Sequence, residues 1–114
     1  MKISKRQVDG ITVVTLDGRL DSSASGQVMD ELCGFVNAGS IMLILNLQKL
    51  TYISSAGLRS VLVAAKLVKT LNGDMRLCEA NGLVSETLTT SGFSNIINLD
   101  SDEESSIKML AGKL

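Results

Sequence analysis

The middle of the chain holds the strongest signal for the fold, the segment "SIMLILNL" at residues 40–47, which contains an unbroken apolar run at residues 41–45. A run this short, flanked by turn-prone residues, predicts a central strand that is covered on both faces. The segment that follows has apolar residues at helical spacing, namely Leu58, Val61, Leu62, Ala65 and Val68. A buried strand followed by an amphipathic helix is the unit from which parallel sheets are built. The sequence therefore predicts an α/β fold.

The rest of the chain continues this alternation. Residues 1–8 and 11–16 predict two antiparallel strands, because Asp9-Gly10 between them favours a hairpin turn. The later elements are expected in this order: a helix that ends at residues 37–39, the strand at 40–47, the helix described above, a strand at 74–80, a helix at 83–93, a strand at 95–99 and a helix at 101–114. Right-handed crossovers place such helices on a mostly parallel sheet. We expect one domain over residues 1–114, with four to five strands, an N-terminal hairpin and helices packed on the sheet.

The first of these helices is expected to pack through one apolar stripe. The stripe is formed by Ala24, Val28, Leu32, Phe35 and Val36, which recur at helical spacing. Asp21, Ser22 or Ser23 can cap the start of this helix.

The composition excludes several classes of function. The chain has no histidine, which removes any Ser-His-Asp site and any histidine-ligated metal. Cys33 and Cys78 lie far apart without CxxC spacing, so buried reduced thiols are expected rather than a metal site or a disulfide. The net charge is −1 and only three residues are aromatic, so nucleic-acid binding is not predicted. No cofactor and no metal are expected.

The apolar segments are too short to cross a bilayer. The longest unbroken runs, at residues 41–45 and 61–65, fall far below the roughly 20 residues that a membrane-spanning helix needs. The N-terminal segment is charged and does not resemble a secretory signal. We expect a soluble intracellular protein without direct membrane insertion.

The stretch "YISSAGLR" at residues 52–59 joins the apolar region to the second helix, and it has two interpretations. In the first, Ser54 or Ser55 accepts a hydrogen bond from the first turn of the helix and contributes about 1 kcal/mol. In the second, one hydroxyl is exposed at the positive end of the helix, where a phosphate would be stabilised. The small Ala56 and Gly57 leave the serines uncovered, and Gly57 costs helix stability that a purely structural start does not need. Both interpretations stay open on these residues alone.

The chain resembles a known family along almost its whole length. The segments "LDGRLDSSAS", "LILNLQKLTYISSAGLRSVL", "LNGDMRLCEANGLVSETL" and "SGFSNIINL" occur in this order. Together they resemble the STAS domain of bacterial anti-sigma factor antagonists. Ordinary dinucleotide binding is not expected, since no GxGxxG or GxxxxGK[ST] motif is present.

The resemblance implies a small, non-catalytic, cytoplasmic regulator of transcription. Such a protein binds an anti-sigma factor that is also a serine kinase and thereby displaces a sigma factor. The kinase phosphorylates a serine at a helix start, binding is lost, and a serine phosphatase resets the cycle. By position, Ser55 is the expected phosphate acceptor. Ser54 stands where the family usually has Asp and is the second candidate.

The resemblance also implies a partner-binding surface around these serines. Its expected members are Asp21, Ser54, Ser55, Ala56, Gly57 and Arg59. Arg59 could pair with a phosphate or could be an ordinary solvated charge. The alternative function is a STAS-type module that senses a nucleotide or lipid, or a subunit of a larger assembly such as a transporter. An enzyme has little support, because no base or metal ligand is apparent.

Overall fold

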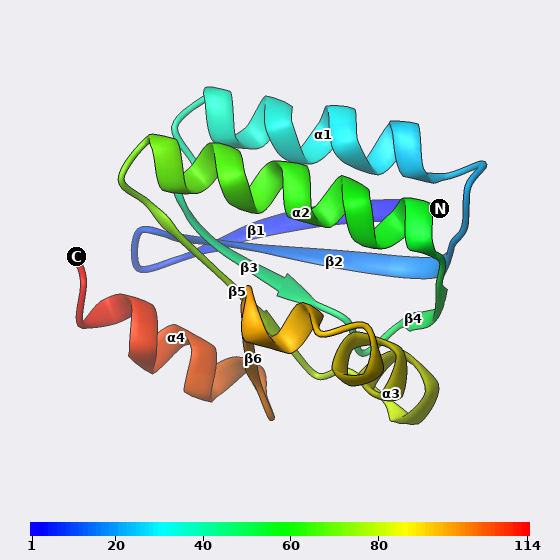
Figure 1. The fold of residues 1–114 in the computed structure, drawn as a ribbon. Coiled ribbons are helices and arrows are strands. Elements are labelled where there is room, and N and C mark those ends of the chain that lie inside the picture. Colours follow the sequence, from blue (N-terminus) through cyan, green and yellow to red (C-terminus); the bar gives the residue numbers. More distant parts are fainter.

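The computed structural model describes residues 1–114 and shows an α/β domain (Figure 1). Its elements are, in order, β1 (Lys2–Val8), β2 (Ile11–Leu20), α1 (Ser25–Asn37), β3 (Met42–Asn46), β4 (Leu50–Ile53), α2 (Ser55–Thr70), β5 (Asp74–Cys78), α3 (Gly82–Thr90), the 3₁₀ helix η1 (Phe93–Asn95), β6 (Asn98–Asp100) and α4 (Glu103–Ala111). The predicted order of strands and helices is confirmed. Two elements, β4 and η1, were not predicted.

The sheet is mostly parallel, as expected. Its strand order is β1-β2-β3-β5-β6, and β4 pairs with β2 beside this path. Only β1 runs antiparallel to its neighbour, because the β1–β2 hairpin turns at Asp9 and Gly10. Both turn residues have positive φ angles, 50° and 85°, which is the backbone that a tight hairpin turn requires. The sheet has six strands rather than the expected four to five.

The additional strand changes how β2 ends. β2 continues to Leu20, beyond its predicted end at residue 16. Its residues 18–20 pair with β4, with a register shift between Gly18 and Arg19. Asp and Gly are unfavourable in strands, so sequence pattern alone ends β2 too early. Pairing with β4 holds the segment extended. As a result, the carboxyl ends of β2 and β4 lie side by side where α1 and α2 begin (Figure 1).

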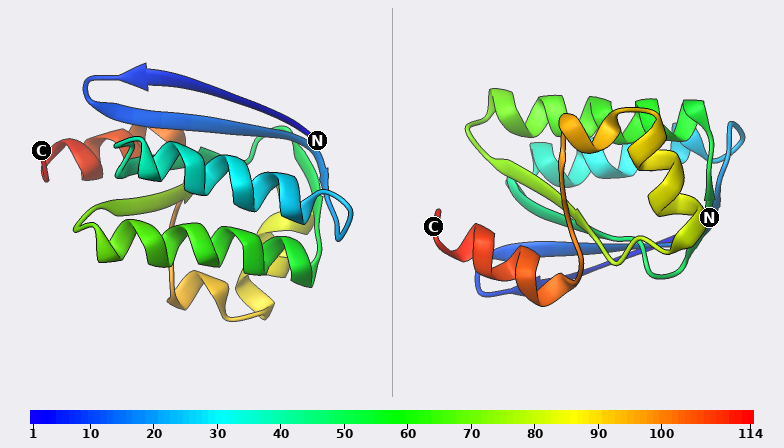
Figure 2. Two further views of the ribbon diagram at one scale, coloured as in Figure 1. Left: turned by 90° about the horizontal axis from the view of Figure 1, so that it is seen from above. Right: turned by 60° about the horizontal axis from the view of Figure 1, so that its bottom comes forward.

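Helices α1 and α2 lie side by side on one face of the sheet (Figure 2). The predicted stripes pack there: Val28, Leu32 and Val36 of α1, and Val61, Ala65 and Val68 of α2, are buried in the main core. Phe35, Leu58 and Leu62 pack against this core while remaining partly exposed. Helix α3 and η1 close one end of the same core.

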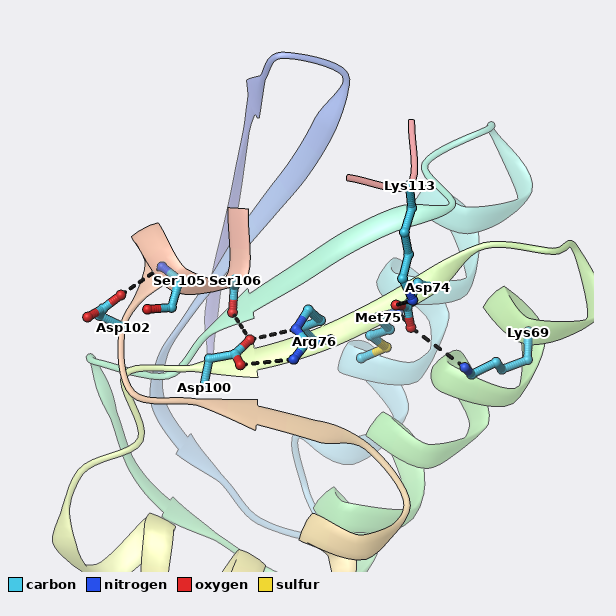
Figure 3. Close-up of polar contacts among 9 residues, drawn as sticks. All are labelled: Lys69, Asp74, Met75, Arg76, Asp100, Asp102, Ser105, Ser106 and Lys113. Atoms are coloured by element: carbon cyan, nitrogen blue, oxygen red, sulfur yellow. Dashed lines mark hydrogen bonds and ion pairs between the residues drawn. The ribbon is translucent and has the colours of Figure 1, made fainter. Parts of the chain in front are cut away.

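Helix α4 covers the other face of the sheet. The apolar cluster beneath it is small and consists of Ile11, Val13, Ile44, Cys78 and Leu110. Polar contacts supplement it: Arg76 donates two hydrogen bonds to Asp100, at 2.6 and 2.9 Å, and the Ser106 hydroxyl donates a third at 2.6 Å (Figure 3). Asp102 caps α4 by accepting a hydrogen bond from the Ser105 N–H at 2.7 Å.

The last strand is shorter than predicted. The segment 95–99 was expected to be a strand, but Phe93–Asn95 forms the 3₁₀ helix and the strand begins at Asn98. Phe93 and Ile97 are buried in the main core. The apolar residues around η1 therefore pack against the core from an irregular segment and not from a strand. None of the helices combines the length and the apolar composition that crossing a membrane requires.

Both cysteines are free thiols. Cys78 is fully buried on β5, and burial, reinforced by the charges of Glu103 and Glu79, raises the pKa of its thiol to about 12. Cys33 is only partly buried, and there too burial, with the charge of Asp30, raises the thiol pKa. The prediction of buried thiols is confirmed for Cys78, whereas Cys33 retains some exposure.

Candidate functional site at the start of α2

Ser54 is the capping residue of α2. Its backbone is extended, with φ −91° and ψ 172°, and its hydroxyl oxygen accepts a hydrogen bond from the Gly57 N–H at 3.1 Å. The Ser54 N–H donates to the Leu20 carbonyl at 2.9 Å, which ties the cap to the end of β2. The capping role that the sequence left open between two serines therefore belongs to Ser54.

Ser55 is the first residue of α2, and its side chain is exposed. Its hydroxyl makes no hydrogen bond within the protein, in contrast to the hydroxyl of Ser54. The N–H groups of Ser55 and Ala56 also find no acceptor within the chain. Such N–H groups, together with the helix dipole, favour negative charge at a helix start. The Ser55 hydroxyl thus stands where an added anionic group would be stabilised and where another protein could reach it.

Gly57 has a structural role that the sequence did not reveal. It is buried, and a Cβ atom at this position would lie 2.7 Å from both Cγ and the carbonyl oxygen of Leu20. It would also lie 3.2 Å from Cγ1 of Ile53. The interpretation that a structural helix start does not need Gly57 is therefore wrong. Gly57 is buried and lets α2 approach β2 closely.

Asp21 lies in the neighbouring loop, directly after Leu20. One of its carboxylate oxygens accepts hydrogen bonds from the Ser23 N–H at 3.0 Å, the Ser23 hydroxyl at 2.6 Å and the Ala24 N–H at 3.2 Å. The hydrogen bond from the Ser23 side chain is the largest cause of a lowered Asp21 pKa; burial opposes it, and the backbone hydrogen bonds and Arg19 add to it. Asp21 is thus fixed next to the start of α2 as a carboxylate.

The predicted cap of α1 needs a correction. The N-cap residue of α1 is Ala24, which makes no side-chain cap, and the helix begins at Ser25. The Asp21 carbonyl accepts hydrogen bonds from the N–H groups of Ala24 and Ser25, both at 3.1 Å, and this forms a turn before the helix. The Asp21 side chain stabilises that turn and does not cap α1.

Arg59 is exposed and makes no ion pair within the protein. It stands four residues after Ser55 in α2, so both side chains lie on the same face of the helix. Ala56 is partly exposed between them. Of the six predicted surface residues, all but Gly57 have side chains at least partly accessible at this end of the sheet.

One pair of side chains near this surface was not predicted from the sequence. Arg19 stacks over the ring of Tyr52, with its guanidinium carbon 4.3 Å from the ring centroid. The two residues are paired in register between β2 and β4. Because β4 was not predicted, nothing in the sequence pattern brought them together.

The surface is not hollowed. Neither of the two cavities of the protein is lined by a residue of the Ser54–Gly57 segment. No group of three or more His, Cys, Asp or Glu side chains is arranged to hold a metal ion. An accessible hydroxyl that lies outside both cavities suits contact with another macromolecule better than enclosure of a small substrate.

Comparison with known proteins identifies relatives of the chain. The STAS domain model matches residues 2–106. A protein of Bordetella bronchiseptica named BtrV, described as a candidate anti-sigma factor antagonist, is 36% identical over 104 residues, which cover 91% of this chain and 90% of BtrV. An anti-sigma F factor antagonist of Paenibacillus polymyxa is 29% identical over 113 residues, covering 96% of this chain and 95% of its own length.

Solved structures share the fold. A candidate anti-sigma factor antagonist of Thermotoga maritima superimposes with a TM-score of 0.90 at 16% identity, covering 96% of this chain and 94% of that protein. The antagonist SpoIIAA in its unphosphorylated form gives a TM-score of 0.75 at 21% identity, covering 97% and 99%. SpoIIAA of Bacillus in its phosphorylated form gives 0.70 at 20%, covering 95% and 99%. With these relatives and the family match, the chain belongs to the STAS-domain family of anti-sigma factor antagonists.

Proposed function

We propose that this protein is a non-catalytic regulator that binds an anti-sigma factor with serine kinase activity. Phosphorylation of Ser55 by that kinase ends the binding, and a serine phosphatase restores it. The relatives named anti-sigma factor antagonist support the kind of partner. The observation that carries the proposal is the exposed, unbonded Ser55 hydroxyl on a helix start whose cap is supplied by Ser54.

The two serines differ in the way that this proposal requires. Ser54 is partly buried, and its oxygen already accepts the Gly57 N–H. A kinase must bring the attacking hydroxyl into line with the γ-phosphate of ATP. Ser55 can be presented in this way without breaking a hydrogen bond of the fold. Ser54 cannot, so it remains the second candidate.

The start of α2 can accommodate the phosphate. The Ser55 and Ala56 N–H groups are available as donors, and the helix dipole favours the negative charge. Arg59 lies one turn further on the same face and can pair with the phosphate. The family's usual Asp is replaced by Ser54, which removes a carboxylate that would repel the phosphate. The scaffold is therefore expected to survive modification.

The same phosphate would act strongly on a docked partner. A charge close to −2 placed about 5 Å from one partner carboxylate costs roughly 5 kcal/mol at an effective dielectric constant near 20. If screening and relaxation halve this value, the remaining repulsion weakens binding about a hundredfold. No conformational change of the antagonist is needed. The rest of the proposed contact surface is formed by Ala56 and Arg59 of α2 and by Asp21 in the neighbouring loop.

The proposal can be tested by reconstitution with the anti-sigma factor purified from the native host. Complex formation is measured with ATP and with a non-hydrolysable ATP analogue. We expect the wild-type complex to persist with the analogue and to dissociate with ATP. Ser55→Ala should stay bound in both conditions, because it cannot be phosphorylated.

Ser54→Ala is the matched control, because it removes the neighbouring hydroxyl and leaves Ser55 in place. It should be released by ATP like the wild type. Release of Ser55→Ala by ATP, or retention of Ser54→Ala, would contradict the assignment of Ser55. Absence of any complex with the anti-sigma factor would contradict the proposed function itself.

A further inference from the structure

The larger of the two cavities lies at the opposite end of α2 from Ser55. It has a volume of about 380 Å³ and opens between the C-terminal half of α2, the start of β5 and the segment that joins η1 to β6. This volume falls within the range of roughly 300–1,000 Å³ that is typical of small-molecule sites. The cavity is independent of Ser55 and of the function proposed above.

The inner surface of the cavity is apolar. Ala65, Met75 and Ile97 line it and are almost fully buried, with exposed fractions of 7%, 3% and 5%. Ile96 forms part of the wall and is 60% exposed. No aromatic side chain lines the cavity, so nothing is present on which a nucleotide base could stack. This lining suits a saturated hydrocarbon chain.

The rim on the side of α2 is positively charged. Lys66 and Lys69 both line the cavity and lie three residues apart on one face of the helix. Lys66 is exposed and has no ion-pair partner in the protein. Its ammonium group is free to bind an anion at the mouth of the cavity.

Asp74 is the one acidic residue in the lining, and its charge is already compensated (Figure 3). One of its oxygens accepts a hydrogen bond from Lys113, and the other lies 3.6 Å from the Lys69 Nζ and accepts the Met75 N–H at 2.9 Å. Burial raises the pKa of Asp74, but the two lysines and the hydrogen bonds outweigh it, so the pKa is lowered. The paired carboxylate leaves the unpaired Lys66 to set the charge preference of the rim.

We propose that this cavity binds a single-chain aliphatic carboxylate, with its head group at Lys66 and its tail against Met75 and Ile97. The apolar lining provides the binding free energy for the tail, and the lysine selects the sign of the head group. The occupant is a free molecule in solution rather than a lipid within a membrane, since the apolar surface is recessed between α2 and β6.

The test is a titration of the full-length, isotope-labelled protein with decanoate, below the concentration at which decanoate forms micelles, followed by NMR. We expect saturable shifts of the Ala65, Ile97 and Asn98 signals. Octanoate, which is shorter by two methylene groups, should bind about tenfold more weakly. Decyltrimethylammonium, with the same tail length and the opposite charge, should bind at least about tenfold more weakly than decanoate.

Variants locate the head group. Lys66→Glu should weaken decanoate binding about fivefold, because it replaces attraction by repulsion at an exposed position. Lys2→Glu makes the same charge change on β1, at the opposite edge of the sheet, and should leave the affinity unchanged. The proposal is overturned by equal binding of the cationic amphiphile, by equal effects of the two substitutions, by shifts outside the cavity, or by binding to anionic phospholipid vesicles without binding of decanoate.

Discussion

The starts of α1 and α2 lie next to each other at the same end of the sheet, but they differ in the charge of the side chain that accepts the nearby N–H groups. Before α1, the Asp21 carboxylate accepts the N–H groups of Ser23 and Ala24. At α2, the neutral Ser54 hydroxyl accepts only the Gly57 N–H, and the N–H groups of Ser55 and Ala56 stay free. The Asp21 carboxylate places a negative charge before α1, whereas the first turn of α2 contains no acidic side chain.

This difference bears on the proposal that Ser55, rather than a serine before α1, is phosphorylated. A helix dipole favours an anion at either start, but the Asp21 carboxylate already places a negative charge beside the start of α1. A phosphate in the Asp21 loop would meet a carboxylate that is already bound. A phosphate on Ser55 meets free donors and the exposed Arg59 instead.

The largest expected effect concerns partner binding at the α2 start. Phosphorylated protein should bind the anti-sigma factor about a hundredfold more weakly than unmodified protein. Ser55→Asp adds a single charge and should weaken binding about tenfold. Ser4→Asp makes the same change on the exposed surface of β1 and should have no effect. Calorimetry or surface plasmon resonance would measure these affinities. Equal effects at Ser4 and Ser55 would contradict the proposal that the partner binds at the start of α2.

The next effect concerns the glycines of the two helices. Gly57→Ala places a Cβ atom 2.7 Å from the Leu20 backbone and should lower the free energy of unfolding by about 2 kcal/mol. Gly34→Ala in α1 meets no atom within 4 Å. It should raise the stability by up to about 1 kcal/mol, since Ala is the better helix former. Urea denaturation measures both, and a neutral Gly57→Ala would show that α2 can move away from β2.

A smaller effect separates the two adjacent serines. Ser54→Ala removes the cap of α2 and should cost about 1 kcal/mol of stability. Ser55→Ala removes an exposed hydroxyl without hydrogen bonds and should change stability by less than about 0.5 kcal/mol. Thermal or urea unfolding of both variants decides the point. A larger loss for Ser55→Ala would mean that Ser55, not Ser54, supports the helix.

The smallest effect is on the protonation of Asp21. Because its pKa is lowered in the folded protein, its contribution to stability is present above the unfolded-state pKa of about 3.9 and is lost as the pH falls through the folded-state pKa. Ser23→Ala removes the largest cause of the lowering and should move the Asp21 pKa upward. NMR titration of the carboxyl carbon measures this shift. An unchanged pKa would show that the hydrogen bond from the Ser23 side chain does not stabilise the Asp21 carboxylate.

Much of the fold could be predicted because its signals are local. The β1–β2 turn is encoded by Asp9-Gly10, and the buried strand β3 by its apolar run. β4 could not be predicted, because Leu50–Ile53 is short and is held extended by pairing with the end of β2. The same omission hid the contact between Arg19 and Tyr52.

Only those features of the site that depend on residues adjacent in the sequence could be predicted. "ISSAG" marks a helix start, but either serine satisfies the capping pattern, and only the backbone geometry assigns the cap to Ser54. The role of Gly57 depends on the distance to Leu20, a residue 37 positions earlier in the chain, so no local pattern could reveal it. Ser55 was predicted as the phosphate acceptor from family resemblance, and its exposure agrees with what that role needs.

Ser55, and not the adjacent Ser54, is the proposed phosphate acceptor. The most direct measurement incubates the protein with its anti-sigma factor kinase and ATP, and then locates the phosphate by mass spectrometry of the intact protein and its peptides. We expect one phosphate on Ser55 in the wild type and in Ser54→Ala, and none in Ser55→Ala. A phosphate on Ser54, Ser22 or Ser23 of the wild type, with Ser55 unmodified, would contradict the account.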